Sequence, residues 1–278
     1  MLKRMRTTHP ILYCLLAEGL FLGLTFAASG LVELGLGALG IDLAGADEYL
    51  LGTVQELFAA AVAAGILAAT GKLKVLRQRG CGFMNGLLAG MYPVVLIGQT
   101  FASTLMFYRP QMPLRPAWQI LTFAANMILV GLAEEMLFRG VIAQTLLEHY
   151  GTARRGIWQA CLVSGVLFGS AHLINLLSAA PFGVLMQCLF AASLGFLLTA
   201  IYYRTGNLWV TVFIHASMDL TALLLNGLYG LSSAAESIDS YDLTTLITVA
   251  VYLIPTAYLL RRRKLPEVAL YWALPGQK

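Results

Sequence analysis

The segment from Gly131 to Gly140, GLAEEMLFRG, places two adjacent carboxylates and one arginine inside a long apolar run. Moving an ionised side chain into hydrocarbon costs at least about 2.5–3.5 kcal/mol, so acids in such a run are candidates for a functional site. Glu135 and Arg139 are four residues apart and share a helix face, which allows an ion pair. Glu134 points about 100° away, so it is free to face a cavity. The same residues also fit a structural charge cluster that holds two helices together.

Three more polar side chains lie in later apolar segments, and the spacing there is again four residues. Phe168 is followed by His172, and His215 is followed by Asp219. Each pair alone fits a packing residue or an intrahelical hydrogen bond. Together with Glu134 they form a set typical of hydrolysis, because a carboxylate can act as general base towards water while imidazole holds water, donates a proton or binds a metal. Two histidines with one or two carboxylates also match an open zinc site.

The composition indicates that most of the chain lies in a lipid bilayer. Of its 278 residues, 59% are hydrophobic and only 12% are charged, with a mean hydropathy of +0.76. A soluble protein would carry about 25% charged residues. Eight segments are apolar enough and near the roughly 20 residues that a span needs: 11–32, 49–70, 84–107, 117–147, 156–177, 181–203, 208–228 and 244–260. We therefore predict an all-α fold, with residues 1–278 forming a single integral membrane domain of about eight transmembrane helices.

The charges between these segments predict the orientation of the chain. With the N-terminus in the cytoplasm, fourteen basic loop residues face inside and only two, Arg109 and Arg115, face outside. The inner set is Lys3, Arg4, Arg6, Lys72, Lys74, Arg77, Arg79, Arg154, Arg155, Arg204 and residues 261–264; the acidic outer residues are Asp42, Asp47, Glu48, Glu236, Asp239 and Asp242. By the positive-inside rule, both termini are cytoplasmic. The net charge of +4 then reflects contact with anionic lipid, and no nucleic-acid partner is predicted.

The predicted depths of the polar residues agree only in part. At 1.5 Å of rise per residue, Glu134 and His172 lie about 22–25 Å from the cytoplasmic ends of their spans, whereas His215 lies about 10 Å from its end. The groups meet only if the helices that carry the first two protrude into the cytoplasm or tilt. Two further acids in or near spans, Glu18 and Glu56, are interpreted as structural or interfacial residues.

The three motifs, in this order on separate helices, resemble those of the CPBP intramembrane proteases. That family comprises the CAAX prenyl proteases and bacterial bacteriocin-processing and immunity proteins. Here its motifs read Glu134-Glu135-Met-Leu-Phe-Arg139, Phe168-Gly-Ser-Ala-His172 and His215-Ala-Ser-Met-Asp219. The resemblance covers a catalytic core at residues 118–228 and implies an intramembrane endopeptidase with a buried cavity that opens to the cytoplasm.

The resemblance also implies roles for individual residues. Glu134 and His172 would activate water, and His215 and Asp219 would stabilise the oxyanion or help bind a metal, Zn²⁺ or another divalent cation, held by these four side chains. Glu135, Arg139 and Phe168 would support them. The prenyl proteases have asparagine at the last motif position. An ionised aspartate cannot donate a hydrogen bond to an oxyanion, which favours a metal-ligand role for Asp219.

The substrate predicted on this basis is a membrane-anchored peptide or protein, either prenylated and of the CAAX type or a bacteriocin or leader peptide. The lipid bilayer is the other partner, and the sequence predicts no oligomeric state. Two other classes use the same residue types. A non-catalytic immunity or scaffold protein would keep the motifs for structural reasons. A proton-coupled transporter would also bury Glu and His residues, but it usually has halves related by an internal repeat, and none is found here.

Overall fold

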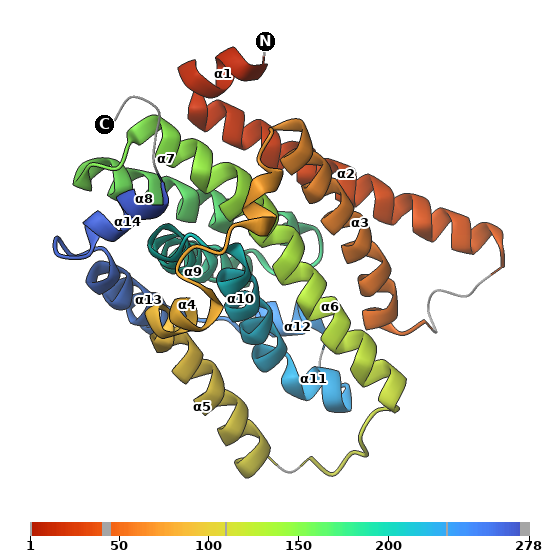
Figure 1. The fold of residues 1–278 in the computed structure, drawn as a ribbon. Coiled ribbons are helices and arrows are strands. Elements are labelled where there is room, and N and C mark those ends of the chain that lie inside the picture. Colours follow the sequence, from red (N-terminus) through yellow and green to blue (C-terminus); the bar gives the residue numbers. More distant parts are fainter. Residues whose placement is uncertain (1, 41–45, 109, 232, 273–278) are drawn as a thin grey trace.

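The chain folds into helices alone within residues 2–40, 46–108, 110–231 and 233–272, the part that the computed structural model describes (Figure 1). The helices are α1 (Leu2–Thr8), α2 (Pro10–Ala38), α3 (Glu48–Ala69), η1 (Leu73–Arg77), α4 (Phe83–Ala89), α5 (Met91–Phe107), α6 (Ala117–Glu135), η2 (Met136–Ala143), α7 (Gln144–Tyr150), α8 (Arg154–Ala171), η3 (His172–Leu177), α9 (Pro181–Thr205), α10 (Leu208–Ala222), α11 (Leu224–Tyr229), α12 (Ala234–Asp239), α13 (Thr245–Leu259) and α14 (Leu265–Tyr271). The predicted all-α class is confirmed. Two of the predicted outer charges, Asp42 and Arg109, lie outside the described residues.

Each of the eight predicted spans coincides with a helix or with two or three consecutive helices. Among the described residues, five helical stretches are long and apolar enough to cross a membrane, or six if the bent pair α4–α5 forms one span. The remaining two segments contain α10 and α13, which are apolar but have only 15 residues each. The protein is thus an integral membrane protein, and the number of eight spans stays a prediction.

The predicted span 84–107 is not one straight helix. It bends by 83° between α4 and α5, at Gly90. Pro93 follows three residues later, and proline has no N–H with which to bond the carbonyl of residue 89, so the helix is interrupted where glycine also weakens it. Pro93 is also the one buried residue of α5, which leaves most of that helix on the surface of the bundle.

The centre of the bundle is α9, which packs against α8, α13, α14 and α10 (Figure 1). From Ala191 to Thr205 every residue of α9 is buried except Ala192 and Arg204, as expected for a helix that is apolar on all sides. Glycines permit the closest contact, between α8 and α9. A Cβ atom on Gly165 would lie 2.7 Å from the carbonyl oxygen of Ala192, and one on Gly195 would lie 2.8 Å from the Cβ of Phe168.

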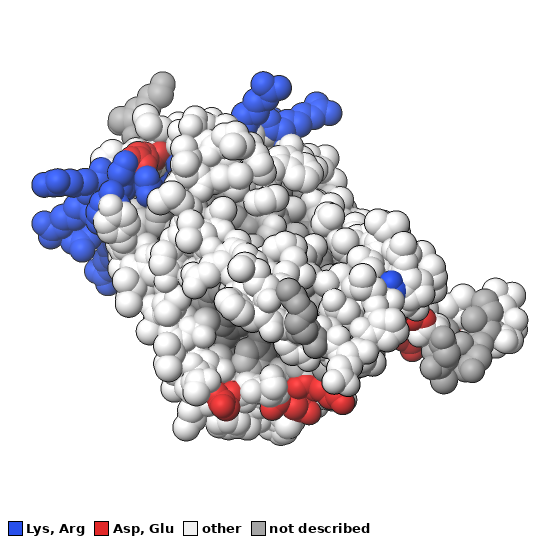
Figure 2. Space-filling view, turned by 90° about the horizontal axis from the view of Figure 1, so that it is seen from below, with Lys and Arg blue, Asp and Glu red and all other residues white. Residues whose placement is uncertain are grey.

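The charges separate towards opposite ends of the molecule. Figure 2 shows most of the Lys and Arg side chains gathered at one end of the visible face and a row of Asp and Glu side chains at the opposite edge. The first and last described helices, α1 and α14, lie together at one end of the bundle in Figure 1. That both termini face the cytoplasm stays a prediction.

A buried lysine anchors the loop between α3 and η1 to α7. The Nζ atom of Lys72 lies 2.6 Å from Oε1 of Glu148 and 3.3 Å from Oε1 of Gln144, and only 6% of the residue is exposed. Burial lowers the pKa of the Lys72 ammonium, and Glu148 opposes that shift. This contact fixes the rotation of α7 relative to the end of α3.

The close contact between α8 and α9 predicts that alanine destabilises the protein at Gly165 but not at Gly23, which lies outside this contact. Glycine to alanine normally stabilises a helix by about 0.5–1 kcal/mol. In Gly165→Ala the new methyl group would overlap α9, and we expect a loss of about 1–3 kcal/mol, measured as a lower melting temperature in detergent. Gly23→Ala is the matched control, because a Cβ atom there meets nothing within 4 Å. Equal shifts for the two variants would contradict the close helix contact.

Candidate active site

The two adjacent glutamates end α6 where the helix changes its hydrogen-bonding pattern. The next eight residues, Met136–Ala143, form the π-helix η2, and α7 continues in the same direction. All eight residues of η2 are buried. The π-helix is rare and is found frequently at functional sites. No residue type in the sequence pointed to it.

Glu135 and Arg139 form the ion pair that their spacing predicts. Nη1 of Arg139 lies 2.8 Å from Oε1 of Glu135, and neither side chain is exposed. Nη2 of Arg139 also donates to the carbonyl oxygen of Gly195, at 3.3 Å. The guanidinium carbon lies 4.6 Å from the centre of the Phe168 ring, within the range of a cation–π contact. The arginine thereby connects η2 with α8 and α9.

The same carboxylate also binds His215 of α10. Nδ1 of His215 lies 2.8 Å from Oε1 of Glu135, and a carboxylate can only accept, so Nδ1 carries the proton. The two helices come close because Gly131 of α6 faces Ala216, where a Cβ atom would lie 3.0 Å from the alanine nitrogen. Glu135 thus fixes both the tautomer and the orientation of His215.

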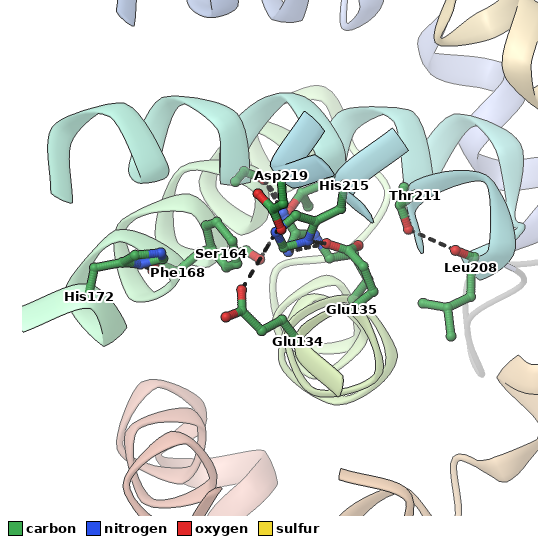
Figure 3. Close-up of polar contacts among 12 residues, drawn as sticks. Glu134, Glu135, Ser164, Phe168, His172, Leu208, Thr211, His215 and Asp219 are labelled. Carbon is green, nitrogen blue, oxygen red and sulfur yellow. Dashed lines mark hydrogen bonds and ion pairs between the residues drawn. The ribbon is translucent and has the colours of Figure 1, made fainter. Parts of the chain in front are cut away.

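The second ring nitrogen of His215 faces the other two predicted acids (Figure 3). Nε2 lies 3.4 Å from Oδ2 of Asp219 and 3.7 Å from Oε2 of Glu134. The Glu134 side chain is 25% exposed, whereas that of Glu135 is fully buried. This difference matches the prediction that one glutamate is neutralised and the other remains accessible.

His172 lies apart from this cluster, on the far side of the Phe168 ring (Figure 3). The ring centres of His172 and His215 are 5.3 Å and 5.5 Å from that of Phe168. Nδ1 of His172 lies 3.0 Å from the carbonyl oxygen of Phe168, which can only accept a hydrogen bond. The proton is therefore on Nδ1, and Nε2 of the neutral ring is left as a hydrogen-bond acceptor.

The difference in predicted depth between the motifs is resolved by the length of one helix. The continuous stretch Ala117–Tyr150 has 34 residues, which is about 51 Å at 1.5 Å per residue. A bilayer core is about 30 Å thick, so this stretch must extend beyond it or tilt. Glu134 therefore lies at the level of His215, which is only the eighth residue of α10.

The four residues predicted to hold a metal are not assembled into one coordination sphere. Within the part of the chain that the structure describes, no group of three or more His, Cys, Asp and Glu side chains could hold a metal ion. His172 is the residue that is separate, since the Phe168 ring lies between it and His215. The residues as arranged do not fit the predicted zinc site, and metal binding by them stays a prediction.

Glu56 lies near the site, although the sequence analysis did not place it there. Glu56 of α3 is partly buried and lies within electrostatic range of Glu134 and Asp219. From the sequence we interpreted Glu56 as a structural or interfacial residue. Its position inside an apolar helix is the feature that could have indicated a place in the site. The other early acid, Glu18, accepts a hydrogen bond from Ser170 on α8, at 3.3 Å, which fits a structural role.

A cavity of about 380 Å³ adjoins the cluster. Its walls include Phe168, His172, His215 and Asp219, together with apolar side chains of α5, α9 and α10. Glu134 is not part of these walls. The cavity lies on the side of the histidines away from the basic end, because its lining continues to the end of α10 and the start of α13. The predicted opening to the cytoplasm stays a prediction.

Comparison with known families identifies the segment that carries this cluster. Residues 116–221 match the family model described as type II CAAX prenyl endopeptidase Rce1-like. The segment runs from just before α6 almost to the end of α10 and contains all seven predicted site residues. A search of curated proteins gave no match. The family resemblance is confirmed for this segment and indicates a membrane endopeptidase.

The buried pair predicts the behaviour of an Arg139→Ala variant. Removing one partner of a buried ion pair leaves an uncompensated charge and typically costs about 3–5 kcal/mol. We expect a clearly lower melting temperature in detergent, together with lower activity. The double variant Glu135→Gln/Arg139→Met removes both charges and should recover part of the stability. An unchanged melting temperature with lost activity would instead assign Arg139 to substrate binding.

Proposed function

Residues 116–221 carry an Rce1-like type II CAAX prenyl endopeptidase domain, and from it we propose that the protein cleaves peptide bonds of membrane-associated peptides. The substrates are prenylated CAAX-type peptides or leader-type peptides. The observation that carries this proposal is the placement of His215. Glu135 holds one of its ring nitrogens, Asp219 and Glu134 face the other, and His172 lines the same cavity as His215.

In the proposed reaction, water attacks the carbonyl carbon of the scissile bond. Glu134 is the more accessible glutamate and takes the water proton, assisted by Nε2 of His172, which is free to accept because Nδ1 is bonded to the Phe168 carbonyl. When the carbon–nitrogen bond breaks, this proton passes to the leaving amine. The bound water contributes its oxygen to the new carboxyl group.

His215 and Asp219 are proposed to stabilise the oxyanion that forms during the attack. The Glu135 carboxylate holds the His215 ring by its Nδ1–H, so Nε2 faces Asp219 and Glu134 and donates to the oxyanion when the ring is protonated on both nitrogens. A donor that is already oriented before the reaction stabilises developing charge without further rearrangement. Arg139 does not itself line the cavity, so we assign it to positioning through Glu135 and Phe168.

We also propose that both termini face the cytoplasm. The separation of basic and acidic side chains to opposite ends supports this orientation (Figure 2). In that arrangement the Lys72 loop and the ends of α7 and α9 meet the anionic lipid surface.

The first experiment compares Glu134→Ala with the wild type. We expect complete loss of cleavage in Glu134→Ala, and likewise in His172→Ala, because each removes a proposed proton acceptor. Mass spectrometry of membrane peptides from cells with each variant measures the products. Glu33→Ala is a matched control, since Glu33 is an exposed acid on α2. Normal processing by a well-expressed Glu134→Ala protein would refute the protease assignment.

The second experiment tests Asp219, for which two roles give opposite results. If Asp219 donates to the oxyanion, Asp219→Asn keeps activity and extends it to high pH, because asparagine donates without being protonated. If it is an ionised metal ligand, the variant loses activity steeply and recovers partly with added zinc. We expect the first result, because the described residues offer no group of three ligands. A pH–rate profile and the metal content of the purified variant decide between the roles.

A further inference from the structure

A second cavity, of about 630 Å³, lies where the chain turns at the ends of two membrane spans. Its walls are residues of the segment 76–83, which follows α3, together with Asn207 and Trp209, which follow α9. Both α3 and α9 are long and apolar enough to cross a bilayer, so the cavity lies near a membrane surface. It shares no lining residue with the cavity beside the histidines.

Hydrogen bonds between the two segments fix the shape of this second cavity. Nδ2 of Asn207 donates to the carbonyl oxygen of Arg79, at 3.1 Å, and Nε1 of Trp209 donates to that of Leu76, at 3.0 Å. Gly80, with a φ of +49°, lets the loop come close to the end of α9, because a Cβ atom there would lie 1.9 Å from a backbone carbonyl oxygen. The walls of the cavity are therefore set by the fold itself.

Two arginines supply the charge of this cavity. Arg77 and Arg79 line it and are exposed, and neither has an acidic partner among the residues that the structure describes. Arg204, at the end of α9, is by contrast paired with Glu267. A guanidinium binds two oxygens of a phosphate at once, so two arginines without carboxylates are suited to an anionic phosphate group.

Aromatic side chains lie beside the arginines. Trp209 and Phe83 line the cavity and are 43% and 39% exposed. The ring of Phe83 packs edge-on against that of Phe213, with 5.7 Å between the ring centres, and Phe213 is also exposed. The indole N–H of Trp209 is already bonded to a backbone carbonyl, so the exposed part of the ring is apolar. A charged group and a hydrocarbon chain can therefore be bound side by side.

We propose that this cavity binds an anionic phospholipid, with the phosphate on Arg77 and Arg79 and the start of an acyl chain along Trp209 and Phe83. Basic pockets between transmembrane helices bind the headgroups of anionic lipids, and tryptophan is enriched at the level of these headgroups. A free phosphate would contact the arginines alone, whereas the exposed aromatic rings fit a lipid. This inference is independent of the proposed protease function, and it gives a role to a basic loop that the proposed reaction does not use.

The test counts the lipids that stay bound to the purified full-length protein, by native mass spectrometry in detergent with added phosphatidylglycerol or phosphatidylcholine. We expect one phosphatidylglycerol to stay bound at concentrations at which phosphatidylcholine does not. Arg77→Gln/Arg79→Gln removes both guanidinium groups and should weaken this binding by about tenfold or more. Both residues are exposed, so the melting temperature of the variant without added lipid should equal that of the wild type.

A matched control removes two charges elsewhere. Arg154 and Arg155 are exposed at the start of α8 and do not line the cavity, so Arg154→Gln/Arg155→Gln should bind phosphatidylglycerol as the wild type does. If the Arg77/Arg79 double variant unfolds, the two single variants carry the test, each with a smaller loss.

Three results would overturn the proposal. Equal weakening in both double variants would show a general attraction of anionic lipid to basic residues, without a site. Equal binding of phosphatidylcholine and phosphatidylglycerol would exclude recognition of the charged headgroup. Release of the bound phosphatidylglycerol by inorganic phosphate at the same concentration would assign the arginines to a free phosphate and not to a lipid.

Discussion

The arrangement of the site depends on the burial of one carboxylate, that of Glu135. A charge without water is tolerated in a protein interior only when it is paired. Here Oε1 of Glu135 is shared by Arg139 and the Nδ1–H of His215. These contacts, with the bond from Arg139 to the Gly195 carbonyl, join η2, α10 and α9 at one point. The positions of the helices that carry the candidate site are therefore determined by the pairing of a charge as well as by apolar packing.

Local spacing explains which parts of the site could be predicted from the sequence. The pairing of Glu135 with Arg139 and the different exposure of Glu134 follow from the period of a helix, so both were predictable. Distances between helices depend on packing, which a single sequence does not contain. The meeting of His215 with Glu134 was expected from the residue types and the family resemblance, not from spacing. The separation of His172 behind Phe168 and the proximity of Glu56 were not predictable.

The helices themselves were predicted better than their breaks. Each apolar run coincides with a helix or with consecutive helices, and five or six of them are long enough to span a bilayer, because burial in hydrocarbon requires a continuous run of apolar residues. The bend at Gly90 was missed although glycine and Pro93 both mark it, because an apolar run continues through them. The central position of α9 follows from its lack of a polar face, a property that also fits a lipid-exposed helix.

The π-helix has a consequence for the phase of the long helix that contains it. Bonds from residue i to i+5 accommodate surplus residues that an α-helix would not hold, so α7 is rotated relative to the direction that α6 alone would set. Deleting one residue of η2 would remove part of this surplus and rotate α7 relative to α6. Glu148 and Gln144 would then turn away from Lys72, while Glu134 and Glu135 would keep their places. The number of residues in η2 therefore sets the direction in which α7 faces the Lys72 loop relative to the two glutamates.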